Sequence, residues 1–369
     1  NALTGDRFAA RRELRYGATP AKFNRPVVER PVPAPVALQG TVVIDGARVF
    51  DAPVTIAAGT VLRMAPGASL VFRNVLTVAG SAASPVRVVP ADGERPWSVF
   101  AILGPGTAGS RVSHLHAEGG SGGMIRDVQY SGMLSVHDTR DIVFDGIQLG
   151  PNKINDDTMH VVYGRDIVVR NSIIENAFGD GIDSDISHIT VSNTTVAASG
   201  NDAIDLMSSR ALIIDSRLIG SGDKGISIGE ASTALVVNTL LKDNKIGIES
   251  KDGSRAYVTN SDMIGNATQV NAYSKNWRYG AGGRAYLDKV VMEGTRNPVS
   301  ADKKSEIGID DSTFLPWPEI EGRHIAVSRD DGPVPGGRKA RRPDHSAPVK
   351  QAIRDFGAVA DPSVRGRLQ

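Results

Sequence analysis

The sequence of 369 residues contains no cysteine, which excludes a disulfide framework and thiol chemistry. Aromatic residues make up only 5% of the chain. No stretch approaches the roughly 20 apolar residues that a membrane-spanning helix needs. The net charge is only +1, so no overall field favours nucleic acid or a membrane surface. We therefore expect neither a nucleic-acid partner nor a membrane span.

Composition divides the chain into three parts. Residues 1–40 join a short Arg-rich stretch to a Pro-rich linker, and we expect residues 4–16 to cap the N-terminal end of the following domain. Residues 41–320 consist of short β-type runs broken by Gly, Asn and Asp. Residues 321–369 are rich in Pro, Gly and Arg, which predicts an extended or mobile tail that lies over the outside.

The middle of the chain repeats every 22 residues. Four consecutive segments of this length, 165–186, 187–208, 209–230 and 231–252, align without gaps. Two columns of the alignment are apolar and one holds Asn or Asp, as at a turn. The columns are Ile182, Ile204, Ile226 and Ile248; Ile174, Val196, Leu218 and Leu240; and Asn171, Asn193 and Asp215.

This period predicts the fold class. Two or three short strands per 22 residues are too few for a propeller blade, and the leucine spacing of leucine-rich repeats is missing. A coil that stacks on the previous one at a strand spacing of about 4.8 Å fits the pattern. We predict an all-β protein, a single right-handed parallel β-helix over 41–320 with an N-terminal cap and an extended C-terminal tail.

Charged residues recur beside the inward isoleucines. Because side chains alternate along a strand, Asp183 points outward where Ile182 points inward. Aligning "TMH" with "GID" adds the preceding coil to the same outward face. That face then holds Asp157, His160, Asp180, Asp183, Asp185, Asp202, Asp205, Lys224, Glu249 and Lys251.

Three interpretations of this face are open. Asp and Asn before Gly are ordinary turn formers. Like charges one rung apart repel, however, which favours a functional cluster. Carboxylate oxygens are also the ligands of Ca²⁺, and a weak Ca²⁺ site would use Asp180, Asp183, Asp202 and Asp205. The expected cofactor is accordingly none or Ca²⁺.

The coil pattern resembles the pectate-lyase-like superfamily of right-handed parallel β-helices. Within it, "GDGID", "GNDAID" and "GDKGISIG" resemble the motif run of polygalacturonases, with Asp180 and Asp202 at two of the aspartate positions. Asn201 stands where that family has a further aspartate, and Lys224 where it has histidine. With these two residues the segment resembles instead the polyuronate lyases and C5-epimerases of this fold. This resemblance implies a lysine or histidine as the general base.

A second resemblance covers more of the chain. The segments "GTVLRMAPGASLVFRN", "YSGMLSVHD", "NDAID", "GDKGISIGE" and "NWRYGAGG" are similar to the β-helix segment found beside spore-coat-protein-H-type (CotH) kinase domains. No catalytic motif accompanies this resemblance. It implies a protein of a bacterial surface, and we expect a secreted, periplasmic or cell-surface location.

Three functions follow as hypotheses. The first is a lyase or C5-epimerase on an acidic, uronic-acid-containing polysaccharide, with Lys224 or His160 as general base. The second is an inverting glycoside hydrolase that uses Asp180 and Asp202. The third is a non-catalytic glycan-binding or cell-surface structural module. In each case we expect a monomer.

Further residues are candidates for contact with the glycan. Lys251 and Arg278 could face substrate carboxylates, and Trp277 and Tyr279 could stack on a sugar ring. The full candidate set is catalytic Lys224, His160, Asp180, Asp202, Asp183 and Asp205, with substrate-binding Lys251, Glu249, His137, Trp277, Arg278 and Tyr279.

Overall fold

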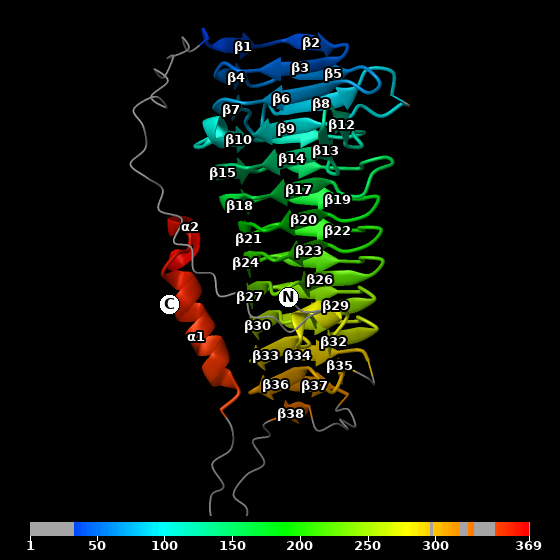
Figure 1. The fold of residues 1–369 in the computed structure, drawn as a ribbon, viewed down its shortest axis with the longest axis vertical. Helices are drawn as coiled ribbons and strands as arrows, with labels where there is room; N and C mark the ends of the chain where they lie inside the picture. The colour runs from blue at the N-terminus through cyan, green and yellow to red at the C-terminus, as the bar shows by residue number, and fades with distance from the viewer. Residues whose placement is uncertain (1–32, 94, 296–297, 317–323, 328–343, 369) are drawn as a thin grey trace, which may run out of the picture. The chain divides into compact units, whose positions relative to one another are not determined.

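The structure, a computed structural model, describes residues 33–93, 95–295, 298–316, 324–327 and 344–368. Within these residues the chain winds repeatedly through three parallel sheets, and each coil stacks on the one before it (Figure 1). The predicted cap at residues 4–16 lies outside the described residues. The described coils begin at β1 (Val36–Leu38) and end at β38 (Ile325–Val327).

Each coil contributes one strand to each sheet in turn. The 13 strands of the first sheet are β1 (Val36–Leu38), β4 (Val54–Ile56), β7 (Leu76–Ala79), β10 (Arg111–Ser113), β15 (Arg140–Asp145), β18 (Arg165–Arg170), β21 (His188–Ser192), β24 (Arg210–Ile214), β27 (Thr233–Val237), β30 (Arg255–Thr259), β33 (Arg284–Asp288), β36 (Glu306–Asp310) and β38 (Ile325–Val327). The 12 strands of the second are β2 (Thr41–Ile44), β5 (Val61–Met64), β8 (Val86–Pro90), β11 (Leu115–Ala117), β16 (Gln148–Leu149), β19 (Ile173–Glu175), β22 (Thr195–Ala197), β25 (Arg217–Ile219), β28 (Leu240–Lys242), β31 (Asp262–Ile264), β34 (Val291–Glu293) and β37 (Thr313–Leu315). The 11 strands of the third are β3 (Ala47–Phe50), β6 (Ser69–Phe72), β9 (Phe100–Leu103), β14 (Leu134–His137), β17 (Met159–Val162), β20 (Ile182–Asp185), β23 (Ile204–Met207), β26 (Lys224–Gly229), β29 (Ile246–Lys251), β32 (Thr268–Tyr273) and β35 (Val299–Ala301).

The predicted isoleucine column is confirmed. Ile182 pairs with Ile204, Ile204 with Ile226, and Ile226 with Ile248, and all four side chains are fully buried. They belong to one core that is filled from all three sheets. Burial of an isoleucine side chain contributes about 1.5–3 kcal/mol, so a column repeated in every coil stabilises the whole stack.

The turn from the first to the second sheet is also where the repeat placed it. Asn171, Asn193 and Asp215 have φ values of 53°, 45° and 52°, a left-handed conformation that Asn and Asp tolerate. Asn193 Nδ2 donates to Asn171 Oδ1 of the previous coil at 2.8 Å. These side chains therefore link successive turns as well as forming them.

One predicted column is wrong at its last member. Leu218 pairs with Leu241, whereas Leu240 pairs with Arg217. The register changes because Thr233 lies 23 residues after its partner Arg210, one more than the repeat. Glu230 and the residue after it both have positive φ and accommodate the extra residue at that corner.

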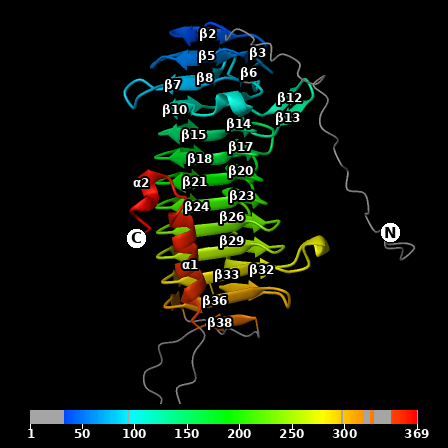
Figure 2. The same ribbon diagram turned by 60° about the vertical axis from the view of Figure 1, so that its left-hand side comes forward.

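The end of the chain differs from the predicted extended tail. Described residues there form α1 (Ser346–Gly357) and α2 (Pro362–Arg365), which lie outside the coils, and α1 runs along the first sheet (Figures 1 and 2). The two helices and the residues beside them pack there because apolar residues four positions apart meet an apolar patch on strands β24 and β27. These apolar residues and the patch are Ala352, Phe356, Ala360, Val364 and Leu368 with Leu212, Ile214, Leu235 and Val237.

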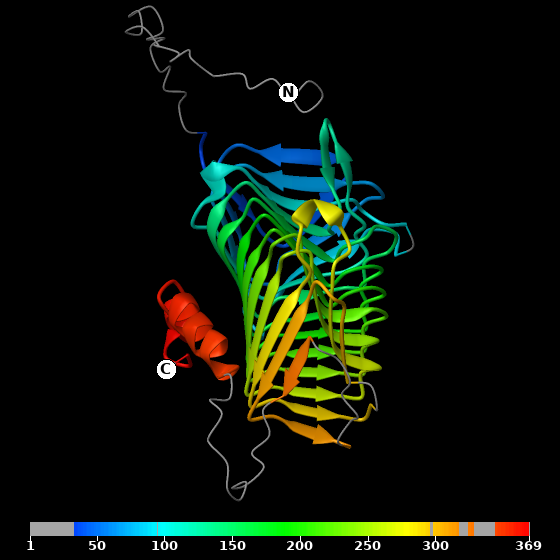
Figure 3. The ribbon, with the colours of Figure 1, turned by 60° about the horizontal axis from the view of Figure 1, so that its bottom comes forward.

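Two excursions project from the third sheet on the same side of the stack (Figures 2 and 3). One is the antiparallel hairpin of β12 (Gly123–Ile125) and β13 (Val128–Tyr130). The other is the loop after β32 that carries the 3₁₀ turn η3 (Trp277–Tyr279). A further 3₁₀ turn, η2 (Pro105–Thr107), follows β9. The hairpin covers the apolar outer part of the first strands of this sheet, where Tyr130 packs against Val71 and Ala101.

Candidate functional site

The outward column of the third sheet is charged from β17 onward. Strand pairing places His160 opposite Asp183, Asp183 opposite Asp205, and Ser227 opposite Glu249. The loops that enter these strands add further carboxylates and a lysine. We call the whole set the acidic face: Asp156, Asp157, His160, Asp180, Asp183, Asp185, Asp202, Asp205, Asp223, Lys224 and Glu249.

His160 occupies the end of the acidic face nearest the hairpin. Its Nδ1 lies 2.8 Å from Ser131 Oγ, and its Nε2 lies 3.4 Å from Asp185 Oδ2 and 3.8 Å from Asp183 Oδ2. The ring also meets the edge of His137, with ring centroids 5.3 Å apart. The imidazole is thus held at one nitrogen and directs the other toward two carboxyl groups.

Asp183 and Asp180 are carboxyl groups that hold their protons unusually tightly. Burial, reinforced by the charges of Asp157, Asp185, Asp205 and Asp180, raises the pKa of Asp183 to about 9. Burial and the neighbouring Asp202 raise the pKa of Asp180 to about 8, although Asp180 Oδ1 accepts a hydrogen bond from the Asp202 backbone at 2.7 Å. Both groups are therefore available as proton donors near neutral pH.

Lys224 is the central cation of the acidic face. Its Nζ contacts Asp223 and lies 3.4 Å from Asp202 Oδ1 and 4.0 Å from Glu249 Oε1. Burial alone would lower the pKa of Lys224, but its hydrogen bond to Asp223 and the charges of Asp202 and Glu249 raise it above its usual value. Lys224 and Asp202 therefore form an ion pair, and the lysine stays protonated.

The ion pair also makes Asp202 a stronger acid than its neighbour Asp180. Burial raises the pKa of Asp202 and Lys224 lowers it, which leaves a value of about 6. At pH 7 Asp202 is mainly ionised, whereas Asp180, one rung away, is mainly protonated. Adjacent carboxyl groups in opposite protonation states can serve as a base and an acid.

Three of the residues expected to contact a glycan are buried. His137 lies between Tyr130 and His160, and burial together with His160 lowers the pKa of His137 to about 4. Glu249 is only 4% exposed and accepts from Asn271 at 3.0 Å. Lys251 is 6% exposed and donates to Ser227 Oγ at 2.6 Å. In this structure protein contacts hold these three side chains, and little of their surface is presented to solvent.

The remaining expected contacts project into solvent. Trp277 is 80% exposed, and the Arg278 guanidinium lies 5.9 Å from its ring centroid. The loop is anchored by Asp252, whose Oδ1 accepts from the backbone of Lys275 and Asn276 at 2.7 Å each. An exposed tryptophan on an anchored loop has the chemistry to stack on a sugar ring.

Two groups within the acidic face have the oxygen-rich composition that suits a divalent cation. Asp156, Asp157 and Asp180 bring ligand atoms within 4.8 Å of one another, as do His160, Asp183 and Asp185. Asp157 Oδ2 is buried and has no hydrogen-bond partner among the described residues. This unsatisfied oxygen fits a cation ligand, since Ca²⁺ prefers carboxylate oxygens. The predicted Ca²⁺ residues Asp202 and Asp205 are outside these two groups.

Two residues that contact the acidic face, Ser131 and Asp223, are absent from the candidates predicted from the sequence. Ser131 reaches His160 only because the hairpin folds back over the third sheet, and nothing periodic in the sequence signals that contact. Asp223 could have been recognised, since it directly precedes Lys224 in "GDKG" and contacts its ammonium.

Comparisons with known proteins agree with the coil architecture. Residues 135–281 match the family described as "Right handed beta helix region". No curated protein matches the sequence. None of the helices in the described part of the chain is long and apolar enough to cross a membrane.

Solved structures that resemble this chain include a polygalacturonase, a phage tailspike protein and an alginate lyase. A family 28 exopolygalacturonase of Yersinia enterocolitica is 14% identical with a TM-score of 0.50, covering 77% of this chain and 74% of its own. Tailspike protein 2 of bacteriophage CBA120 is 10% identical with a TM-score of 0.50, and the match covers 70% of this chain and 43% of the tailspike chain. An alginate lyase of Paenibacillus is 14% identical with a TM-score of 0.46, and the match covers 73% of this chain and 93% of the lyase chain. The likeness at such identities shows the fold alone: this chain is a right-handed parallel β-helix, the architecture that it shares with the exopolygalacturonase and the tailspike protein.

Proposed function

We propose that this protein is a lyase or C5-epimerase that acts on an acidic polysaccharide at the acidic face. The observation that carries the proposal is the juxtaposition of His160 with Asp183, a basic nitrogen 3.8 Å from a carboxyl oxygen that retains its proton. Both reactions begin with removal of the proton at C5, next to the uronate carboxyl group. Both also need a second group that donates a proton.

His160 is the better candidate for the general base. Lys224 remains protonated among Asp223, Asp202 and Glu249, so it cannot readily accept a proton. Burial raises the pKa of Asp157 to about 6 against the opposing effect of the Ser131 hydroxyl, and that hydroxyl also lies against His160 Nδ1. In the tautomer in which Nδ1–H donates to the Ser131 hydroxyl, Nε2 is the nitrogen that can take a proton.

Asp183 then supplies the proton. In a lyase, His160 Nε2 takes the C5 proton, the C4–O bond breaks, and the leaving oxygen takes the proton of Asp183. In an epimerase, His160 Nε2 takes the C5 proton from one face, Asp183 delivers its own proton to C5 from the opposite face, and the C4–O bond stays intact. Lys224 offsets negative charge at the site. A divalent cation held by Asp156, Asp157 and Asp180 would neutralise the uronate carboxylate.

An inverting hydrolase is the second candidate. It is favoured by Asp180 and Asp202, neighbours in opposite protonation states at pH 7. Asp180 would protonate the leaving oxygen and Asp202 would activate water. One coil spacing of about 4.8 Å is shorter than the roughly 6.5–9.5 Å typical of inverting pairs, which places this candidate second. For either reaction we propose that the protein is exported to a compartment that contains polysaccharide. We also propose that it acts as a monomer.

The test is incubation with alginate, polygalacturonate and glucuronan, with Ca²⁺ or with EDTA. Ultraviolet absorbance of an unsaturated end marks a lyase, NMR of the C5 configuration marks an epimerase, and reducing ends alone mark the hydrolase. His160→Ala and Asp183→Asn should each lower kcat by about 10²–10⁴-fold. His116→Ala, a histidine on the second sheet, is the matched control. Binding without turnover on all three glycans would refute the proposal and favour a glycan-binding module.

A further inference from the structure

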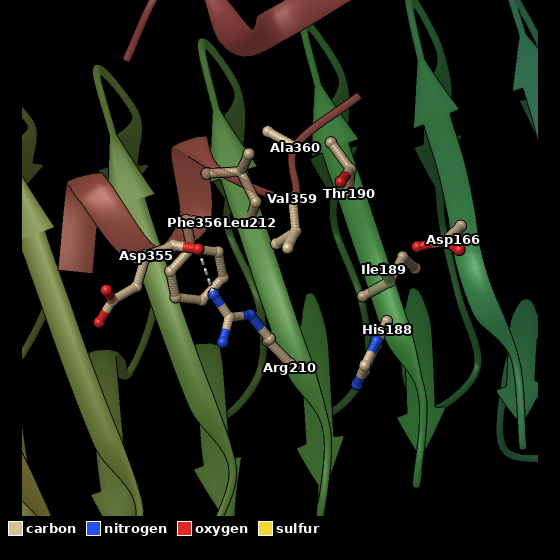
Figure 4. Close-up of a pocket in the computed structure, with 10 residues that line it drawn as sticks. All are labelled: Asp166, His188, Ile189, Thr190, Arg210, Leu212, Asp355, Phe356, Val359 and Ala360. Atoms are coloured by element: carbon tan, nitrogen blue, oxygen red, sulfur yellow. Dashed lines mark hydrogen bonds between the residues drawn. The ribbon is translucent and has the colours of Figure 1, made fainter. Parts of the chain in front are cut away.

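A pocket of about 240 Å³ lies between the outer face of the first sheet and the segment joining α1 to α2 (Figure 4). It lies on a different sheet from the acidic face. One side is apolar and consists of Leu212, Phe356, Val359 and Ala360. Arg210 and its paired neighbour His188 supply polar groups on the other side. The pocket exists only because α1 docks on the sheet.

Arg210 is held in a fixed position at the base of this pocket. Its Nη2 donates to the backbone oxygen of Asp355 at 3.0 Å, and its guanidinium lies 3.9 Å from the centroid of the Phe356 ring. The Asp355 carboxylate does not neutralise it, because that group accepts from Gln351 at 2.7 Å and points away from the guanidinium (Figure 4). Backbone and ring contacts therefore orient the cation without balancing its charge.

Arg210 forms no ion pair with a carboxylate within the described part of the chain. Its Nε is buried and lacks a hydrogen-bond partner among the described residues, so a molecule in the pocket cannot reach that nitrogen. The Nη atoms are the donors open to the pocket, and Asp355 uses one N–H of Nη2. A guanidinium cannot lose its proton in a protein, so its natural complement is an acceptor with negative charge that enters the pocket.

The size and apolar side of the pocket specify the rest of that molecule. An apolar cavity of roughly 150 Å³ is enough to hold benzene. The larger volume here can therefore take a six-membered ring and a carboxylate, with the ring against Phe356 and Val359. Asp166 also borders the pocket, but it lies beyond His188 on the side away from Arg210 (Figure 4). It would disfavour an anion at that end, which leaves Arg210 as the place for the acid group.

We propose that this pocket binds a small monocarboxylic acid with an apolar or aromatic ring, whose carboxylate accepts from the Nη groups of the Arg210 guanidinium. The site is independent of the proposed reaction at the acidic face. Benzoate is the simplest probe of this chemistry. Benzamide keeps the ring without the charge, benzylamine reverses the charge, and glucuronate keeps the acid on a polar ring.

The experiment is titration calorimetry of the full chain with each probe. We expect saturable binding of one benzoate per chain, binding of benzamide and glucuronate weaker by about tenfold or more, and no binding of benzylamine. Arg210→Gln should weaken benzoate binding by about tenfold or more. Since this change also removes contacts to α1, Val359→Trp provides a second variant, which fills the pocket from its exposed rim and leaves Arg210 in place.

Absence of benzoate binding to the wild-type chain would overturn the proposal. So would unchanged benzoate affinity in Val359→Trp, or glucuronate binding as tightly as benzoate. Loss of binding in Val359→Trp with an unchanged melting temperature supports the pocket as the site, whatever Arg210→Gln does to the helix.

Discussion

The protonation of the Asp183 carboxyl group makes the stability of the folded protein depend on pH. Its folded-state pKa of about 9 is raised well above the unfolded value of about 4. The folded state therefore keeps a proton that the unfolded chain releases from about pH 4 upward. The stability that this proton contributes is complete below pH 4 and is lost progressively as the pH rises toward 9.

We therefore expect Asp183→Asn to remove part of this pH dependence. The amide has the shape of the protonated acid but never ionises, so the variant should gain stability over the wild type as the pH rises from about 5 to 9. Urea denaturation at several pH values measures the effect. Asp45→Asn, at an exposed carboxylate near the first coils, is the control. A stability difference that does not vary with pH would contradict the protonated state of Asp183.

Substitutions of Lys224 and Asp202 test whether the acidic face is the site of the reaction. Asp202→Asn removes one charge of the pair and Lys224→Ala removes the cation that Asp202, Asp223 and Glu249 share. We expect each to abolish turnover, since the site then loses its charge balance, while the coil core keeps the fold intact. Rates with the active glycan and circular dichroism measure the two effects. Full activity in both variants would place the reaction elsewhere on the molecule.

At the scale of one element, α1 is held by a few side chains. Phe356 is 4% exposed and contributes both apolar contact and the Arg210 interaction. Phe356→Ala should destabilise docking of the helix by up to about 3–5 kcal/mol, the range for a deleted buried aromatic ring. Amides of Ser346–Gly357 should then exchange faster, while those of the coil strands keep their rates.

Hydrogen exchange followed by mass spectrometry separates the two parts. Val359→Ala, a residue 67% exposed beside the same helix, is the control and should leave the exchange of α1 unchanged. If Phe356→Ala accelerated exchange equally in strands β24 and β27 and in the distant strands, α1 would be an integral part of the coil fold. Equal rates in wild type and variant would show that other contacts hold the helix.

At the scale of the whole molecule, stability depends on columns shared by every coil. Ile204→Asp would place a charge in a fully buried position between Ile182 and Ile226. Burial of an unpaired charge should destabilise the protein by several kcal/mol and lower the melting temperature of the whole coil stack. Ile173→Asp is the matched control, because Ile173 is 40% exposed on β19. Similar melting of both variants would contradict the inward column.

The parts of the fold that recur could be predicted from the sequence. Parallel strands stack in register, so a residue lies above the one 22 positions earlier, and repeated letters become neighbours in space. This reasoning placed the Ile182 column inside and His160, Asp183 and Asp205 together outside. It failed at Leu240, where one extra residue at the preceding corner shifted the register of the next strand.

Segments without the repeat were decided only by the tertiary structure. The hairpin that brings Ser131 to His160, and the helix that forms a pocket with Arg210, make contacts at sequence separations that no periodicity encodes. The protonation of Asp183 is also a tertiary property. It depends on burial and on four other carboxylates, two from the same coil and one from each neighbouring coil, and the pKa rises only once these groups share one poorly solvated face. The sequence by itself determined the coil and the residues on its face, because both follow from a regular spacing, whereas the folded structure determined which of those residues hold a proton.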